Sequence, residues 1–185
     1  MKHSKTKFFL LILIFGHFIS CSSNDVQDEE NNNSNNTVTA TINGSAFKGS
    51  FDVNLATILQ GGTTETLTIT ASHEDLPDNG FSISLLIYHR KGDILNEGIY
   101  TYKKDCEFLS EFCSDIMMLK YENQNFTDQC APVYNENTEF QIGITSIDYK
   151  IGGHVIGDFS GVISCDSGED VKIENGKFNL EIIKL

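Results

Sequence analysis

Hydrophobic and polar residues alternate through most of the chain. In the stretch that begins at Thr37, Val38, Ala40 and Ile42 alternate with threonines. A period of two with many Thr, Val, Ile and aromatic residues is typical of β-strands that bury one face. Three further stretches predict such strands, with one face collecting Leu67, Ile69 and Ala71, then Phe81, Ile83, Leu85 and Ile87, then Phe140, Ile142 and Ile144.

The C-terminal stretch VKIENGKFNLEI consists of two alternating runs around Asn175–Gly176. These two residues tolerate the positive φ angles of a type I′ turn. A two-residue loop at this point places Glu174 opposite Lys177 and Ile173 opposite Phe178. The sequence therefore predicts a β-hairpin over residues 171–182.

The stretch 151–165 also predicts a strand, rich in glycine. One face carries Ile151, Val155, Phe159, Ile163 and Cys165. Only residues 106–114 are candidates for a helix. About nine or ten short strands with turns between them favour a single all-β domain over residues 37–185, built as an antiparallel β-sandwich or a barrel-like sheet.

The first 20 residues have the order of a secretory signal peptide. Three lysines precede an apolar run from Phe8 to Phe15, which is too short for the roughly 20 residues of a membrane-spanning helix. The string FISC that ends at Cys21 resembles a bacterial lipobox, in which the cysteine is lipidated and becomes the mature N-terminus. The alternative is ordinary secretion, with Cys21 a free thiol or a disulfide partner.

Residues 21–36 predict a lipidated N-terminus and a disordered tether, because the stretch is acidic and rich in asparagine and has only Val26 to bury. Its acidic cluster resembles the export tag of surface lipoproteins of Bacteroidota: Asp25, Asp28, Glu29 and Glu30. We therefore expect an outer-membrane lipoprotein exposed at the cell surface, with the periplasmic face as the alternative.

Several strand and turn motifs of the domain resemble a family of Bacteroidota envelope lipoproteins of unknown function. They are ATINGSAFKGSF, GIYTY, GITSID, GDFSGVIS and VKIENGKFNLEI. The resemblance covers most of residues 38–183 and implies a β-rich domain behind a lipid anchor, with no assigned activity. The stretch from Lys103 to Pro132 is longer than in that pattern.

The domain contains an even number of cysteines, which predicts disulfides in an exported protein. They are Cys106, Cys113, Cys130 and Cys165. A zinc site is the alternative, but the paired close spacing of structural zinc sites is absent.

Strand geometry ranks the three possible connectivities. A hairpin between residues 98–102 and 116–121 places Cys106 opposite Cys113. A hairpin between residues 139–146 and 154–164 places Cys165 opposite about residue 133, close to Cys130. We therefore predict Cys106–Cys113 and Cys130–Cys165, although a helix over residues 106–114 would hold the first two cysteines about 10 Å apart, beyond bonding reach.

The charge of the chain excludes nucleic acid as a partner. Without residues 1–20, which hold three lysines and no carboxylates, 10 basic and 26 acidic residues leave a net charge of −16. Nucleic-acid binding needs a basic surface. The acidic loop 166–170 is a weak candidate for calcium through Asp166, Glu169 and Asp170, since carboxylates suit that cation; we otherwise expect no cofactor beyond the lipid on Cys21.

No catalytic motif is present. The histidines of the domain, His73, His89 and His154, stand in no metal-binding pattern, and GDFSG is not a nucleophile elbow. We expect a non-catalytic binding, adhesion or structural domain with a protein or glycan partner. The absence of tryptophan leaves aromatic stacking on a glycan to Tyr88, Tyr100, Tyr102, Tyr121 and Tyr134. The alternatives are a barrel that carries a small apolar ligand and, third, an envelope hydrolase.

Overall fold

The computed structural model describes residues 36–50, 54–73, 79–107, 109–123, 125–134 and 138–184. All of them belong to the unit Asn33–Leu185. The signal peptide, Cys21 and the predicted tether up to residue 35 lie outside the described residues. None of the helices among the described residues has the length and apolar character needed to cross a membrane.

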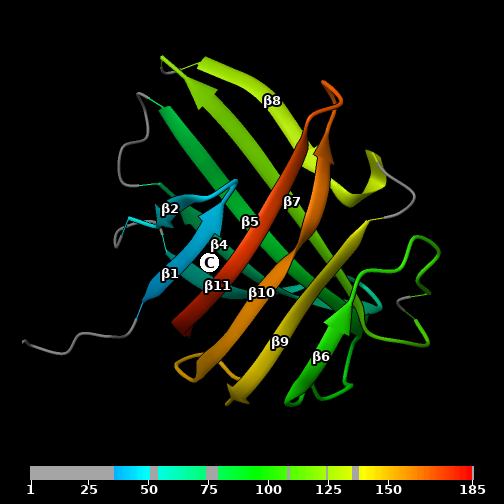
Figure 1. The fold of residues 1–185 in the computed structure, drawn as a ribbon. Coiled ribbons are helices and arrows are strands. Elements are labelled where there is room, and N and C mark those ends of the chain that lie inside the picture. Colours follow the sequence, from blue (N-terminus) through cyan, green and yellow to red (C-terminus); the bar gives the residue numbers. More distant parts are fainter. Residues whose placement is uncertain are drawn as a thin grey trace, which may run out of the picture. The chain divides into compact units, whose positions relative to one another are not determined.

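The described residues form eleven strands and one 3₁₀ turn, η2 (Pro132–Tyr134), which confirms the all-β prediction (Figure 1). The strands are β1 (Thr37–Ile42), β2 (Ser45–Lys48), β3 (Leu55–Gln60), β4 (Thr64–Ser72), β5 (Asn79–Arg90), β6 (Gly98–Thr101), β7 (Cys113–Glu122), β8 (Asn125–Ala131), β9 (Glu139–Ile147), β10 (His154–Cys165) and β11 (Asp170–Ile183).

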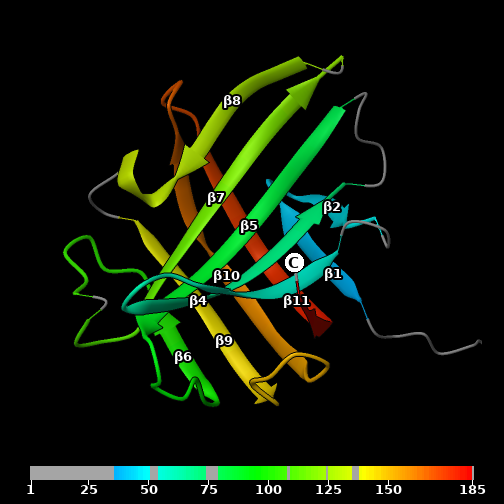
Figure 2. The ribbon, with the colours of Figure 1, turned by 180° about the vertical axis from the view of Figure 1, so that it is seen from behind.

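The strands form two layers that are joined at their edges into one barrel-like sandwich. One layer has the order β2-β1-β11-β10-β9-β6, and the other, seen in front in Figure 2, has the order β3-β4-β5-β7-β8. At one corner the end of β11 pairs with β3 in parallel, through Ile182 with Ala56. At another corner β10 pairs with β8, through Cys165 with Cys130. These two corners close the sheet.

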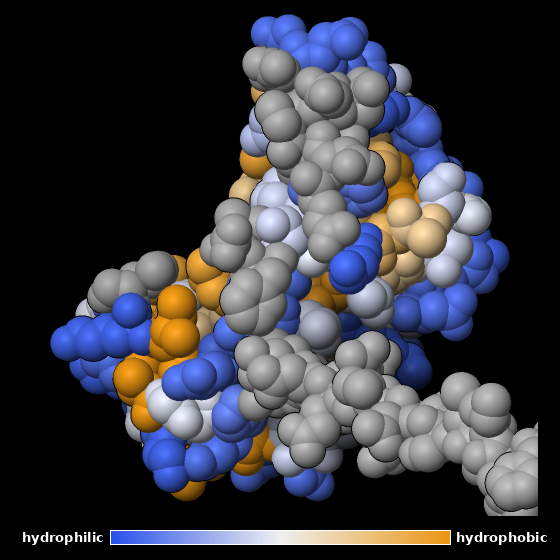
Figure 3. Space-filling model, turned by 90° about the vertical axis from the view of Figure 1, so that its left-hand side faces the viewer, coloured by the Kyte–Doolittle hydropathy of each residue, from blue (hydrophilic) through white to orange (hydrophobic). Residues whose placement is uncertain are grey.

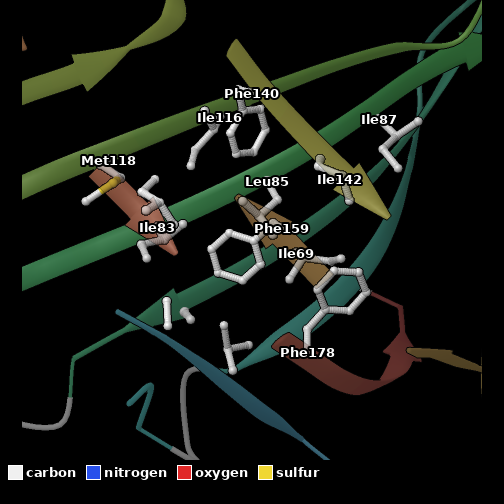
Figure 4. Packing of buried hydrophobic residues seen from close by; sticks show 14 of the residues in the cluster. Ile69, Ile83, Leu85, Ile87, Ile116, Met118, Phe140, Ile142, Phe159 and Phe178 are labelled. Atoms are coloured by element: carbon white, nitrogen blue, oxygen red, sulfur yellow. The ribbon is translucent and has the colours of Figure 1, made fainter. Parts of the chain in front are cut away.

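The core lies between the two layers and contains the residues that the alternation placed on inward faces. Ile69, Ile83, Leu85 and Ile87 from one layer face Ile142, Phe159 and Phe178 from the other (Figure 4). All of these side chains are buried. Burying one such side chain stabilises the fold by roughly 1.5–3 kcal/mol, so the apolar face of each alternating run packs inward.

The predicted C-terminal hairpin is wrong, because β11 is one continuous strand of 14 residues. Asn175 has a positive φ of 53°, but it forms a bulge rather than a turn. Between Glu174 and Lys177 the registers with both β1 and β10 shift by one residue. Ile173 and Phe178 are five residues apart, so a straight strand would place them on opposite faces. A one-residue bulge corrects this phase as well as a two-residue turn does.

The strand predicted over residues 151–165 is β10, with one residue misplaced. Val155, Phe159 and Ile163 are buried as predicted, whereas Ile151 is 50% exposed in the turn before the strand. The backbone of Gly157 lies against the Phe178 ring, and a Cβ at this position would come within 2.5 Å of that ring. Glycine at this position therefore lets the Phe178 ring and the neighbouring backbone of Gly143 pack closely against β10.

Both predicted disulfides are present, although one argument for them was wrong. Cys106–Cys113 spans 5.8 Å between Cα atoms, and Cys130–Cys165 spans 3.7 Å. The described residues between Cys106 and Cys113 form turns and no helix. However, β6 pairs with β9 and not with β7, so the first disulfide closes a loop rather than a hairpin. The second joins two neighbouring strands where the layers meet.

Candidate functional site

A groove opens at the end of the domain, where β3 and β4 meet the turn after β5, the β9–β10 turn and the end of β11. It has a volume of about 690 Å³, within the range of small-molecule sites. Its lining comes from β3, β4, the turn after β5, the β9–β10 turn and the residue after β11: Ile58, Leu59, Gln60, Glu65, Gly92, Asp93, Ile94, Tyr149, Lys150, Ile151 and Lys184. We call this hollow the Tyr149 groove.

The wall of the Tyr149 groove carries large apolar side chains in contact with solvent. Leu59 is 45% exposed, Ile94 69% and Ile151 50%. Single exposed hydrophobic residues are ordinary on protein surfaces, but these three come from separate segments and line one hollow. Figure 3 shows hydrophobic residues that reach the surface between hydrophilic ones on one face of the domain. The grouping therefore distinguishes the groove as a place for an apolar ligand.

The lining residue Tyr149 is hydrogen-bonded to a buried side chain behind the groove. The Tyr149 hydroxyl lies 2.8 Å from Nε2 of His89, which is fully buried. Nδ1 of His89 lies 3.1 Å from the carbonyl oxygen of Arg90. Because a carbonyl only accepts, Nδ1 carries the hydrogen, and in the neutral ring Nε2 is left to accept from Tyr149. The pair thus holds the tyrosine ring in place.

The electrostatics keep this tyrosine neutral. Burial raises the pKa of Tyr149, and the negative charge of Glu65 raises it further. The hydroxyl hydrogen is directed to His89, so the tyrosinate that would act as a nucleophile or base is disfavoured. The chemistry available here is apolar contact and hydrogen bonding.

An aromatic cluster connects His89, behind the groove, to the Cys106–Cys113 loop. The Phe112 ring lies 5.4 Å from His89 and 5.7 Å from Tyr100, measured between centroids. Tyr100 donates a hydrogen bond of 2.6 Å to the Asn96 carbonyl. Tyr100 and Tyr102 are both partly buried and pack against the core.

The rim of the groove is charged, with most of its groups paired. Gln60 donates to Glu65 at 2.9 Å, and Arg90 pairs with Asp93 at 2.9 Å. Lys150 pairs with Asp148 at 2.8 Å, and both side chains are more than half exposed. Exposed pairs of this kind contribute about 0–1 kcal/mol, so an incoming anion competes with Asp148 at little cost.

The three carboxylates of the candidate calcium loop have different partners. Asp170 accepts a hydrogen bond from Ser164, and Glu169 pairs with Lys120 at 3.2 Å. Asp166 hydrogen-bonds to the carboxylate of Asp128 on β8. These three side chains therefore do not point to one shared ligand position.

The interaction between Asp128 and Asp166 shifts the pKa values of the two carboxyl groups in opposite directions. The hydrogen bond from Asp166 lowers the pKa of Asp128, and the same bond raises the pKa of Asp166. Asp128 also lies near the sulfur atoms of Cys130 and Cys165. Those sulfurs are bonded to each other, so they offer no thiolate to a metal.

The other histidines lie apart from the groove. The His73 ring packs 5.8 Å from Phe47, beside a smaller hollow of about 380 Å³ that Phe81 and Tyr121 also line. His154 is half-buried at the start of β10. Sequence reasoning did not single out the His89–Tyr149 pair, although His89 follows Ile87 on the inward face of β5, which was a readable signal.

The fold defines the class of this protein as a disulfide-linked, all-β sandwich with barrel-like closure. Comparison of the chain with known protein families, curated proteins and solved structures gives no match.

Proposed function

We propose that this protein is a lipoprotein of the bacterial cell envelope, anchored through Cys21, whose domain binds a ligand in the Tyr149 groove without catalysing a reaction. The signal peptide and the lipobox-like FISC support export and anchorage. The two disulfides are compatible with an oxidising location outside the cytoplasm. The resemblance to Bacteroidota envelope lipoproteins agrees with the same assignment, and the acidic tag favours the cell surface.

The observation that carries the binding role is the grouping of exposed apolar residues over a fixed tyrosine. Leu59, Ile94 and Ile151 line a hollow of ligand size. A catalytic site needs a nucleophile or base that reaches the substrate. The histidine behind this groove, His89, is fully buried with both ring nitrogens engaged, which supports binding over hydrolysis.

The groove also bears on where a small apolar ligand would bind. A barrel would hold an apolar ligand between its inner faces, but in this domain the Phe- and Ile-rich inner faces pack against each other in the core (Figure 4). The Tyr149 groove, at the end of the sandwich, is the place that such a ligand would occupy. A carrier of this kind is therefore the second form of the same proposal.

Cell fractionation tests the anchor. Cys21→Ala removes the lipid acceptor, and Ser22→Ala is the matched control because it leaves the cysteine in place. We expect the alanine variant of Cys21 to leave the membrane fraction and the control to stay. Retention of the Cys21 variant in the membrane would show that lipidation is not the anchor. Protease added to intact cells then separates display at the surface from the periplasmic face.

A further inference from the structure

The described chain begins next to the Tyr149 groove. The Asn36 amide donates to the Asn179 carbonyl at 2.7 Å, and the Glu181 amide donates to the Asn36 side chain at 3.0 Å. Lys184, which lines the groove, follows Glu181 by three residues, or about 10 Å of extended chain. The start of β1 and the end of β11 lie together in Figure 1.

The β9–β10 turn adds the opposite wall at the same place. The Gly152 amide donates to the Ile182 carbonyl at 2.7 Å, and the Ile182 amide donates back to the Gly153 carbonyl at 2.7 Å. These bonds hold Lys150 and Ile151 beside the end of β11. The groove and the point at which the N-terminal segment enters the domain therefore share one end of the sandwich.

The segment between Cys21 and Asn36 limits how far this end lies from the anchor. Fourteen residues separate the two, so their Cα atoms lie at most about 50 Å apart. A lipid on Cys21 would thus keep this end of the domain within about 50 Å of the membrane surface.

Basic residues gather at this end of an acidic protein, beside the carboxylates of Glu65, Asp93 and Asp148. Of the 10 basic residues after the signal peptide, four lie in the turn after β5, the β9–β10 turn and the segment after β11: Arg90, Lys91, Lys150 and Lys184. Glu65 and Asp93 have partners in Gln60 and Arg90, and Lys150 has its exposed pair with Asp148. Lys184, which lines the groove, forms no ion pair with another described residue, so its ammonium group is available to an anion.

We propose that the Tyr149 groove binds a single-chain anionic amphiphile taken from the membrane to which the domain is anchored. The alkyl chain lies along Leu59, Ile94 and Ile151, and the anionic head lies between the ammonium groups of Lys150 and Lys184. This inference rests on the proposed function, since it names the ligand of the same site and uses the anchor to bring that ligand within reach.

Oleate is the probe that tests the ligand class. The chain carrying Cys21→Ala, purified from whichever fraction holds it, is titrated with oleate and observed by native mass spectrometry and calorimetry. Ile94→Gln and Ile151→Gln alter exposed side chains of the groove, and Ile99→Gln is the matched control because Ile99 is 70% exposed on β6 and does not line the groove. We expect one saturable site, weakened about tenfold by either groove variant, the equivalent of about two buried methylene groups, and unchanged by the control.

Two further experiments test the charge of the head group and the source of the ligand. Lys184→Glu should lower the affinity of the groove for oleate. It should not lower the affinity for dodecyltrimethylammonium, which is the cationic counterpart. Oleate supplied in phosphatidylcholine vesicles should transfer to the protein, as expected for a ligand drawn from a membrane. No saturable site, equal affinity in the groove variants and the control, equal binding of the cation, or failure to extract oleate from vesicles would each overturn the proposal.

Failure of this inference differs from failure of the proposed anchor. If Cys21→Ala stays in the membrane fraction while its oleate binding follows the pattern above, the anchor is wrong and the ligand class stands. If the variant is released but binds no oleate, the anchor stands and the ligand class is wrong.

Discussion

The hydrogen bond between His89 and Tyr149 gives the sharpest test of the site. Tyr149→Phe removes the hydroxyl and keeps the ring, so Nε2 of His89 loses its partner while remaining fully buried. An unsatisfied buried polar group costs about 1–3 kcal/mol. We therefore expect Tyr149→Phe to lower the free energy of unfolding by about 2 kcal/mol, a large part of the 5–15 kcal/mol typical of a domain.

Urea denaturation followed by tyrosine fluorescence and circular dichroism measures this loss. Tyr100→Phe is the matched control, because the Tyr100 hydroxyl donates to the carbonyl of Asn96, which is exposed and keeps water as a partner. The control should lose about 1 kcal/mol or less. Both variants should keep the slope of the unfolding free energy against urea, which shows that the comparison concerns stability alone.

A double-mutant cycle then separates the hydrogen bond from other effects of the substitutions. His89→Phe replaces the orphaned ring with an apolar one, so Tyr149→Phe should cost clearly less in that background than in the native chain. Equal costs in the two backgrounds, or a Tyr149→Phe variant no less stable than Tyr100→Phe, would refute the view that the pair holds the groove in place.

Two further predictions concern the corner where the layers meet. Replacing both cysteines of Cys130–Cys165 with alanine should destabilise the domain by about 1.4 kcal/mol more than the same change in Cys106–Cys113, because the sequence separations are 35 and 7. Urea unfolding of both variants measures this difference. A larger loss of stability from opening the shorter loop would contradict the prediction. Asp166 has a raised pKa, so its bond to the buried carboxylate of β8 stabilises the fold below its ordinary pKa and is lost as pH rises through the raised value. The amide of an Asp166→Asn variant donates a hydrogen bond at every pH. The stability of this variant relative to the native chain should therefore increase from acidic to neutral pH. A difference independent of pH would count against the hydrogen bond from Asp166 to Asp128.

The parts of the fold that the sequence predicted are those that depend on local alternation. In β4 and β5 each inward residue is two positions from the next, and burial follows this period from Leu67 through Ile87. The same period extends to His89. The rule therefore places the histidine behind the groove on the inward face, even though nothing in the sequence names its partner.

The parts that were not predicted depend on partners far away in the sequence. β6 pairs with β9, which begins about 40 residues later, rather than with its neighbour β7. Tyr149 stands in a turn outside any periodic pattern, and the groove takes its walls from five separate segments. Local pattern carries no information on which of these segments meet, so the site follows only from the three-dimensional closure of the sheet.

The misread C-terminal strand shows why such closure matters for function. In a hairpin, residues 178–183 would fold back on residues 171–174, and Lys184 would lie near the Cys165 corner. β11 instead continues because β1 and β10 each pair with it on both sides of the bulge. At 14 residues it spans about 45 Å. The same strand thus starts near the Cys130–Cys165 corner and ends where Asn36 enters, which places Lys184 and the groove at the same end of the domain as the start of β1.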